Sequence, residues 1–245
     1  DDNVVFLTED TPHITGGRYY SWWLATAMKA AGFKVVIYTN RMPVFLDEFK
    51  DYPQPEIVIA SNLYSVDVNA QFYVGSPIVG SLMACRLAEK YRKTAYCEIF
   101  DPFPMMEKYR GEHHYPFWEE LIKLMKRPNV KIISLCKTCN EYIYPWLNKK
   151  RDDVFEIYPC INNKERDKSP KQMEKKNWVV FVSRLSEHKK LDHCLDAIKK
   201  TDCKLQVISS VDEINFSKMV KDKGLSSHAV PAGGCDAHSD RRLRG

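Results

Sequence analysis

Runs of apolar residues alternate along the chain with segments in which apolar positions recur every three or four residues. Residues 4–7 are a continuous apolar run, which predicts a buried parallel strand. A loop with Gly16 and Gly17 follows, and then a helix that Gly32 ends. Residues 34–39 form the next apolar run. This βαβ unit indicates a parallel sheet with helices on its faces, and hence an α/β fold.

The same alternation continues along most of the chain. Ser76 and Pro77 are typical of an N-cap followed by the first helical residue, so we predict that a helix begins there. Apolar periodicity also indicates buried strands and further helices. The strands are predicted at 56–60, 95–100, 130–135 and 154–158, and the helices at 76–91, 117–126 and 142–147.

A polar segment separates two parts of the chain. Residues 162–176 are almost wholly polar, which is typical of a linker. The alternation then restarts, and we predict two α/β domains, 1–165 and 166–245. The second domain is short for a self-sufficient doubly wound sheet. From Pro231 onward the residues also lack periodicity, so this end of the chain is either part of a shortened domain or a tail. Within the second domain the strands are predicted at 178–182 and 204–209, and the helices at 190–200 and 215–223.

Composition excludes several classes of function. The net charge of +5 is spread along the chain rather than gathered on one face, so nucleic-acid binding is not expected. No apolar run is long enough to cross a bilayer. The eight cysteines fall mostly inside apolar patterns, which is typical of free thiols in a reducing compartment, and we expect a cytoplasmic protein without disulfides. Cys136 and Cys139 form a C-x-x-C without a second zinc-spaced pair, so neither a metal nor a redox site is favoured.

The segment FVSRLSEHKKLD carries the strongest candidate for a ligand site. Arg184 and Lys189 lie between the end of a predicted strand and the start of a predicted helix. Two fixed cations beside the N–H groups of a helix N-terminus would suit a diphosphate. The alternative, two solvated surface charges, is less favoured in this context.

Other candidates lie at the predicted carboxyl ends of strands. Gly16 and Gly17 would let backbone N–H groups approach a phosphate or sugar, or they form a tight turn. His13 beside them is placed for a substrate hydroxyl. Glu98 and Asp101 end another predicted strand, where open α/β sheets bind ligands. They are candidates for catalysis or sugar binding, although an acidic loop at this position is often only a turn or a helix cap. The dinucleotide fingerprint is absent, which disfavours a nicotinamide enzyme or an epimerase.

Two basic clusters are candidates for contact with an anionic membrane surface, although solvated helix faces explain them equally well. One combines Trp146 with three following cations, and the other lies on the helix predicted at 117–126. Their basic residues are Lys149, Lys150 and Arg151 in the first cluster and Lys123, Lys126 and Arg127 in the second.

The glycine loop and the segment SRLSEHKKLD together resemble retaining glycosyltransferases of the GT-B fold, family four. The family's first motif reads P-x-x-G-G and its second G-R-L-x-x-x-K-G-x-D. Four residues match the second motif, while Ser183 and Lys190 replace its glycines; the matches are Arg184, Leu185, Lys189 and Asp192. YPCINN resembles the family's interdomain segment, with Pro159 as the strict match, and KDKGLSSHA resembles the stretch after its second Rossmann-like strand.

The resemblance implies two Rossmann-like domains, of which the N-terminal one binds the acceptor and the C-terminal one a nucleotide diphosphate sugar. Arg184 and Lys189 would hold the donor diphosphate without a metal or other cofactor. Gly16, Gly17 and His13 would line the acceptor or phosphate loop, and Asp101 and Glu98 would be the catalytic candidates. A hexose would pass with retention to a glycan, lipid or small-molecule acceptor.

Two departures from the family limit this prediction. A family histidine near the end of the fourth strand is replaced by Phe100 or Glu98. The family's paired glutamates, which bind the ribose and sugar, are not found, which implies a C-terminally truncated chain with an incomplete donor site. The alternative is therefore a non-catalytic module that binds a nucleotide or a partner.

Overall fold

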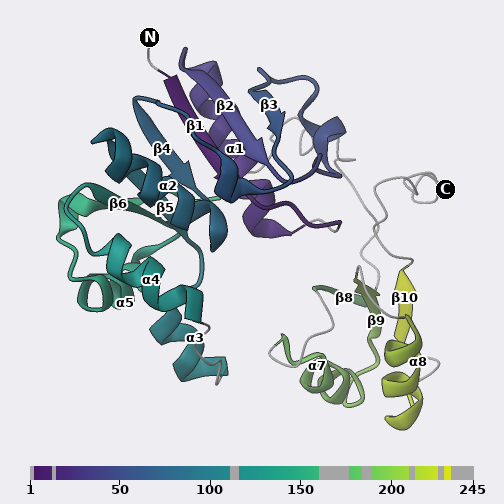
Figure 1. Ribbon diagram of the computed structural model, residues 1–245. Helices are drawn as coiled ribbons and strands as arrows, with labels where there is room; N and C mark the ends of the chain where they lie inside the picture. The colour runs from purple at the N-terminus through teal and green to yellow at the C-terminus, as the bar shows by residue number, and fades with distance from the viewer. Residues whose placement is uncertain are drawn as a thin grey trace. The chain divides into compact units, whose positions relative to one another are not determined.

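The computed structural model describes residues 3–12, 15–110, 116–159, 177–183, 189–209, 213–225 and 229–232. The chain divides into two compact units, Asp1–Asn162 and Asn163–Gly245, which we call unit 1 and unit 2. Each unit is an α/β structure (Figure 1).

Unit 1 is built on a parallel sheet of seven strands in the order β3-β2-β1-β4-β5-β6-β7. Every neighbouring pair is parallel, which confirms the predicted fold class. The order places β1 in the middle, where it pairs with β2 on one side and β4 on the other. The strands are β1 (Asn3–Thr8), β2 (Lys34–Thr39), β3 (Glu56–Ile59), β4 (Phe72–Gly75), β5 (Thr94–Ile99), β6 (Val130–Ser134) and β7 (Val154–Glu156).

Two apolar cores cover the two faces of this sheet. Alternate residues of β1 point to opposite faces, as the strand period of two requires. Val4 and Phe6 lie in one core with Trp22 of α1, and Val5 and Leu7 lie in the other with residues of α2, α4 and α5. Such two-sided burial explains why β1 is a continuous apolar run in the sequence. The helices of unit 1 are α1 (Gly16–Ala30), α2 (Val79–Tyr91), α3 (Phe103–Arg110), α4 (Pro116–Met125) and α5 (Lys137–Leu147).

Five elements of unit 1 differ clearly from the sequence prediction. β4 and α3 were not predicted; β4 ends in Gly75 directly before Ser76 and Pro77, which predict a helix start, and α3 has only eight residues. The helix predicted from Ser76 begins instead at Val79, after an N-cap residue, Ile78, whose side chain makes no capping hydrogen bond. α5 begins at Lys137, earlier than predicted. β3 was predicted to be buried, but it is an edge strand whose residues are all partly or fully exposed.

Glycine at position 80 lets α2 pack against the end of β1. A Cβ atom at Gly80 would lie 2.1 Å from the carbonyl oxygen of Leu7, a backbone atom that cannot rotate away. We expect Gly80→Ala to lower the free energy of unfolding of unit 1 by about 2–4 kcal/mol, because backbone must shift. Urea unfolding followed by tryptophan fluorescence measures this loss.

Gly16→Ala is the matched control, since a Cβ atom there meets nothing within 4 Å. Its effect should stay below about 1 kcal/mol. Equal stability of the two variants would show that α2 does not depend on this close approach.

Unit 2 has a parallel sheet in the order β10-β9-β8, with its apolar core against α7 and α8. The strand predicted at 178–182 is confirmed as β8, but Val180 and Val182 are 52% and 70% exposed. β10 pairs with β9 through Pro231, so a strand reaches into the segment that was predicted to lack periodicity. The elements are β8 (Trp178–Val182), α7 (Leu191–Ile198), β9 (Lys204–Ile208), α8 (Glu213–Asp222) and β10 (Ala229–Ala232).

Candidate functional site

The glycine pair begins α1 directly after β1 and its loop. The N-cap is Thr15, whose hydroxyl oxygen accepts from the backbone N–H of Arg18 at 3.4 Å. A Cβ atom at Gly17 would lie 2.7 Å from Cε2 of the Phe100 ring, so this ring packs where a side chain at position 17 would lie. Gly16 faces open space. Of the two glycines, only Gly16 therefore has room beside it for a ligand; His13 lies outside the described residues.

Arg18 connects the first turn of α1 to the start of α2. Its Nη1 donates to the hydroxyl of Ser76 at 2.5 Å, and its Nη2 donates to the carbonyl oxygen of Pro77 at 2.9 Å. Burial lowers the pKa of this guanidinium, and the carboxylates of Asp10, Glu9 and Glu98 oppose that shift. Sequence reasoning missed Arg18, although a cation in a first helical turn, where the helix dipole disfavours it, was the available signal.

Glu98 lies at the centre of this network, inside β5 and 1% exposed. The hydroxyl of Ser21 donates to its Oε2 at 2.5 Å, and Ser21 also lies 3.2 Å from the Ser76 hydroxyl. Burial raises the pKa of Glu98 to about 7, against the lowering effect of Ser21 and the Arg18 charge. A carboxyl group whose pKa is raised in this way is a candidate for exchanging a proton or a hydrogen bond with a ligand.

A second buried carboxyl, Asp10, lies just after β1. It accepts from the Thr39 hydroxyl at 2.7 Å, and its backbone N–H donates to Oδ1 of Asn40 at 2.7 Å. Burial raises the pKa of Asp10 as well. Sequence reasoning missed this residue, which holds the carboxyl ends of β1 and β2 together and lies in the electrostatic reach of Arg18.

The two acidic residues predicted at the end of β5 line one cavity of about 290 Å³. Glu98 comes from the strand, and Asp101 follows it in the loop before α3. Pro77 and Ile78, which precede α2, line the same space. The structure therefore brings together Glu98, Asp101 and the entry to α2 at the carboxyl end of the sheet, the position at which open α/β sheets bind ligands.

The C-x-x-C pair lies beside this region, at the start of α5. The two sulfur atoms of Cys136 and Cys139 are 3.6 Å apart, and Cys139 also lies 3.6 Å from the carbonyl oxygen of Phe100. Both are free thiols. Burial raises the pKa of Cys139 to about 12, which makes it a poor nucleophile. Within the described ranges, no three His, Cys, Asp or Glu side chains are grouped so as to hold a metal ion.

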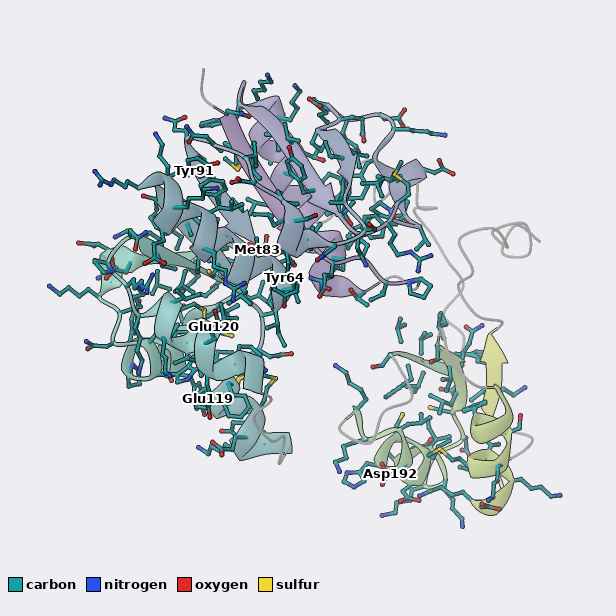
Figure 2. All side chains as sticks on the ribbon, in the orientation of Figure 1. Tyr64, Met83, Tyr91, Glu119, Glu120 and Asp192 are labelled. Carbon is teal, nitrogen blue, oxygen red and sulfur yellow. The ribbon has the colours of Figure 1, made fainter. Side chains whose placement is uncertain are left out.

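In unit 2, Lys189 is exposed two residues before α7 begins. Lys190 between them has φ of 54° and forms the N-cap without a side-chain hydrogen bond. Asp192, in the first turn of α7 (Figure 2), places a negative charge close to this end. Arg184, the other predicted cation, lies outside the described residues.

The structure corrects one part of the predicted membrane-facing clusters. Lys149 is 7% exposed, and its Nζ donates to the carbonyl oxygens of Arg127 and Val130 at 2.7 and 2.6 Å. Its charge is therefore used to close the turn after α4, whereas Lys123, Lys126, Lys150 and Arg151 are exposed. Arg127 is paired with Glu89. None of the helices in the described part of the chain has the length and apolar character needed to cross a membrane.

These features define a class of fold. No protein-family model matches the chain, and no curated protein sequence matches it significantly. The structure is nevertheless similar to solved glycosyltransferases of the GT-B fold along most of its length.

Among these structures are HepE of Anabaena in complex with UDP-glucose, WaaG, a glycosyltransferase involved in lipopolysaccharide biosynthesis, and UGT89C1 of Arabidopsis thaliana complexed with UDP-L-rhamnose. HepE has a TM-score of 0.70 at 11% identity, with 95% of this chain and 68% of that chain covered. WaaG has a TM-score of 0.57 at 13% identity, with 96% of this chain and 70% of that chain covered. UGT89C1 has a TM-score of 0.54 at 12% identity, with 94% of this chain and 68% of that chain covered. At such identities the likeness establishes the fold.

Proposed function

We propose that the chain binds a nucleotide diphosphate sugar and transfers its hexose to an acceptor hydroxyl. The observation that carries this proposal is the similarity of the structure, along 95% of the chain, to HepE in complex with UDP-glucose. A fold alone does not define a function, so the site must supply the rest. Unit 2 contributes a cation at a helix N-terminus, and unit 1 contributes a cavity whose lining includes the acidic residues Glu98 and Asp101.

In this proposal unit 2 holds the donor. Lys189, together with Arg184, would neutralise the diphosphate, and the N-terminus of α7 would add its dipole. Neutralising the leaving nucleoside diphosphate lowers the barrier to breaking the sugar–phosphate bond, since negative charge develops there. Two cations would do this without a metal ion. Transfer with retention at the anomeric carbon follows from the resemblance of SRLSEHKKLD to the family-four motif.

Unit 1 would hold the acceptor. Glu98 and Asp101 belong to the lining of the cavity at the end of β5, and of these two Asp101 would be the candidate to accept a hydrogen bond from an acceptor hydroxyl. Gly16 has open space beside it at the start of α1 for a sugar or phosphate group, and His13 precedes it in the sequence. Arg18, which interacts with Glu98 electrostatically, would act as a positioning residue.

The test is an incubation of the chain with UDP-glucose, UDP-N-acetylglucosamine or GDP-mannose in turn, each together with a set of acceptors that offer a free hydroxyl group (a methyl glycoside, a long-chain alcohol and a phenol), followed by ³¹P NMR for release of the nucleoside diphosphate. The one-bond ¹³C–¹H coupling at the anomeric carbon of the product then reports its configuration for all three sugars. All three donors are α-linked, so retention predicts an α-linked product. A β-linked product would refute retention but not the transfer itself. If all three donors stayed intact and none of them bound to the chain, the proposed function would be refuted.

A non-catalytic nucleotide-binding module is the second candidate. The observation in its favour is that the described sheet of unit 2 has three strands, against seven in unit 1. Binding of UDP without release from any of the three sugar donors would favour this candidate over the transferase.

A further inference from the structure

Two thiols at the start of α5 have no role in the proposed transfer reaction. Cys136 is the N-cap residue of α5 and Cys139 lies in its first turn, so the C-x-x-C motif places both side chains at the end of the helix that follows β6 (Figure 1). Their sulfur atoms are 3.6 Å apart, and both are free thiols. A disulfide bond holds its sulfur atoms about 2.0 Å apart, so rotation of the two side chains within one helical turn would bring them to bonding distance.

The two thiols differ in their access to solvent. Cys136 is partly exposed, whereas Cys139 is 5% exposed. The Cys139 sulfur lies 3.6 Å from the carbonyl oxygen of Phe100, at the end of β5. A reagent in solution therefore reaches Cys136 first, and Cys139 is positioned to react with its neighbour rather than with the reagent.

A second pair of cysteines shows that proximity alone does not define such a site. The sulfur atoms of Cys85, on α2, and Cys97, on β5, are 3.4 Å apart, closer than those of the C-x-x-C pair. These two side chains are 2% and 0% exposed and belong to an apolar core of unit 1. A reagent reaches them only when the core opens, so they provide a comparison within the same chain.

We propose that Cys136 and Cys139 form a thiol–disulfide exchange site that takes a low-molecular-weight disulfide as its oxidant. The Cys136 thiolate attacks one sulfur of that disulfide, which forms a mixed disulfide and releases the other half as a thiolate. Cys139 then loses its proton to solvent, and its sulfur attacks the Cys136 sulfur. The bond between Cys136 and Cys139 forms as the second half leaves. The two cysteines give up two electrons in total, and the oxidant is reduced to two thiols.

The surroundings of Cys139 suit a thiol that acts in the second step. Burial raises its pKa to about 12, and the hydrogen bond and charge of Cys136 contribute to that rise. Both contributions of Cys136 end once its sulfur is in a mixed disulfide. The backbone N–H of Cys136 opposes the rise, as the N-cap N–H does for a side chain in the first turn of a capping box. The short distance between the sulfur atoms then favours the intramolecular attack.

The test exposes the reduced full chain to oxidised glutathione at neutral pH, blocks the remaining thiols by alkylation and locates the products by mass spectrometry. Trypsin cuts after Lys137, between the two cysteines, so their disulfide appears as two peptides that stay joined until a reductant is added. We expect this linked pair to form at least about tenfold faster than any product at Cys85 or Cys97, because those two thiols are shielded by the core. Dithiothreitol should restore both thiols.

Two variants separate the two steps. Cys139→Ala should stop the reaction at the mixed disulfide, with glutathione attached to Cys136. Cys136→Ser should slow the modification of Cys139 at least about tenfold, since Cys139 is buried and its pKa is raised. Cys203→Ser is the matched control, at a partly exposed thiol of unit 2, and should form the linked pair at the wild-type rate.

Three results would overturn the inference. In the first, glutathione stays on Cys136 of the wild-type chain and no bond to Cys139 follows. In the second, the C-x-x-C pair stays reduced while Cys203 is modified. In the third, Cys85 and Cys97 react as fast as the C-x-x-C pair, which would show that access does not select the site. The proposed function is tested separately, because these reactions require no nucleotide sugar.

Discussion

Glu98→Gln is expected to raise the free energy of unfolding of unit 1 above that of the wild-type chain at pH 8. The difference in free energy of unfolding between variant and wild type should be up to about 3 kcal/mol larger at pH 8 than at pH 4. The ordinary pKa of the carboxyl is 4.5, and burial raises it in the folded protein to about 7. Between these values the folded state binds more protons than the unfolded state. The free energy of unfolding of the wild type therefore falls as pH rises from about 4.5 to about 7. Above about pH 7, Glu98 is ionised in the folded state, which then carries the free-energy cost of a buried charge.

The glutamine variant has no charge to bury at any pH, so its stability lacks this decline. Other titrating groups affect both proteins alike, and their effect cancels in the difference between the two. Urea unfolding at pH 4 and pH 8 measures that difference, and tryptophan fluorescence reports mainly on unit 1, because Trp22, Trp23, Trp118 and Trp146 all lie there.

Glu120→Gln is the matched control for this measurement. Glu120 is exposed and pairs with Arg86 on the surface, so its replacement should change stability by less than about 1 kcal/mol at both pH values. If the stability difference between Glu98→Gln and wild type were the same at pH 4 and pH 8, Glu98 would not be the buried, proton-binding carboxyl that the site requires.

The second large effect concerns the donor site. Arg184→Ala and Lys189→Ala should each weaken UDP binding at least tenfold, or about 1.4 kcal/mol, because each removes a charge-assisted hydrogen bond to a diphosphate. Lys200→Ala is the charge-matched control, since Lys200 is exposed and follows the other end of α7. Isothermal titration calorimetry at low and moderate salt measures all three. Equal losses in the Lys200 variant would indicate a general effect of net charge rather than a site.

Much of the fold was predictable because the signals are local. The apolar runs that became β1, β2, β5, β6 and β9 are buried on a sheet, and their composition shows it without knowledge of their neighbours. β4 could not be found in this way, since it ends in Gly75 directly beside Ser76 and Pro77. Those two residues looked like a helix start, but the Ser76 hydroxyl is used by Arg18 instead.

The candidate site was predictable in part. Glu98 and Asp101 were predicted from the rule that parallel strands place ligands at their carboxyl ends, and the structure places both in the lining of one cavity. Arg18, Ser21 and Ser76 were not, because their contacts join positions far apart in the chain, such as Ser21 with Glu98, 77 residues away. The exposure of the β8 side chains could not be predicted either. Their apolar character can be read from the sequence, but the number of strands that flank β8 cannot.

The most direct test of the account is a titration of the ¹⁵N-labelled chain with UDP, followed by amide chemical shifts. The prediction is that shifts concentrate at the end of β8 and the start of α7, from Ser183 through Lys189 to Leu191. Unit 1 would then serve as an internal reference for non-specific effects. No amide shift at millimolar UDP, or shifts that leave this segment unchanged, would contradict the assignment of a nucleotide diphosphate site to the protein.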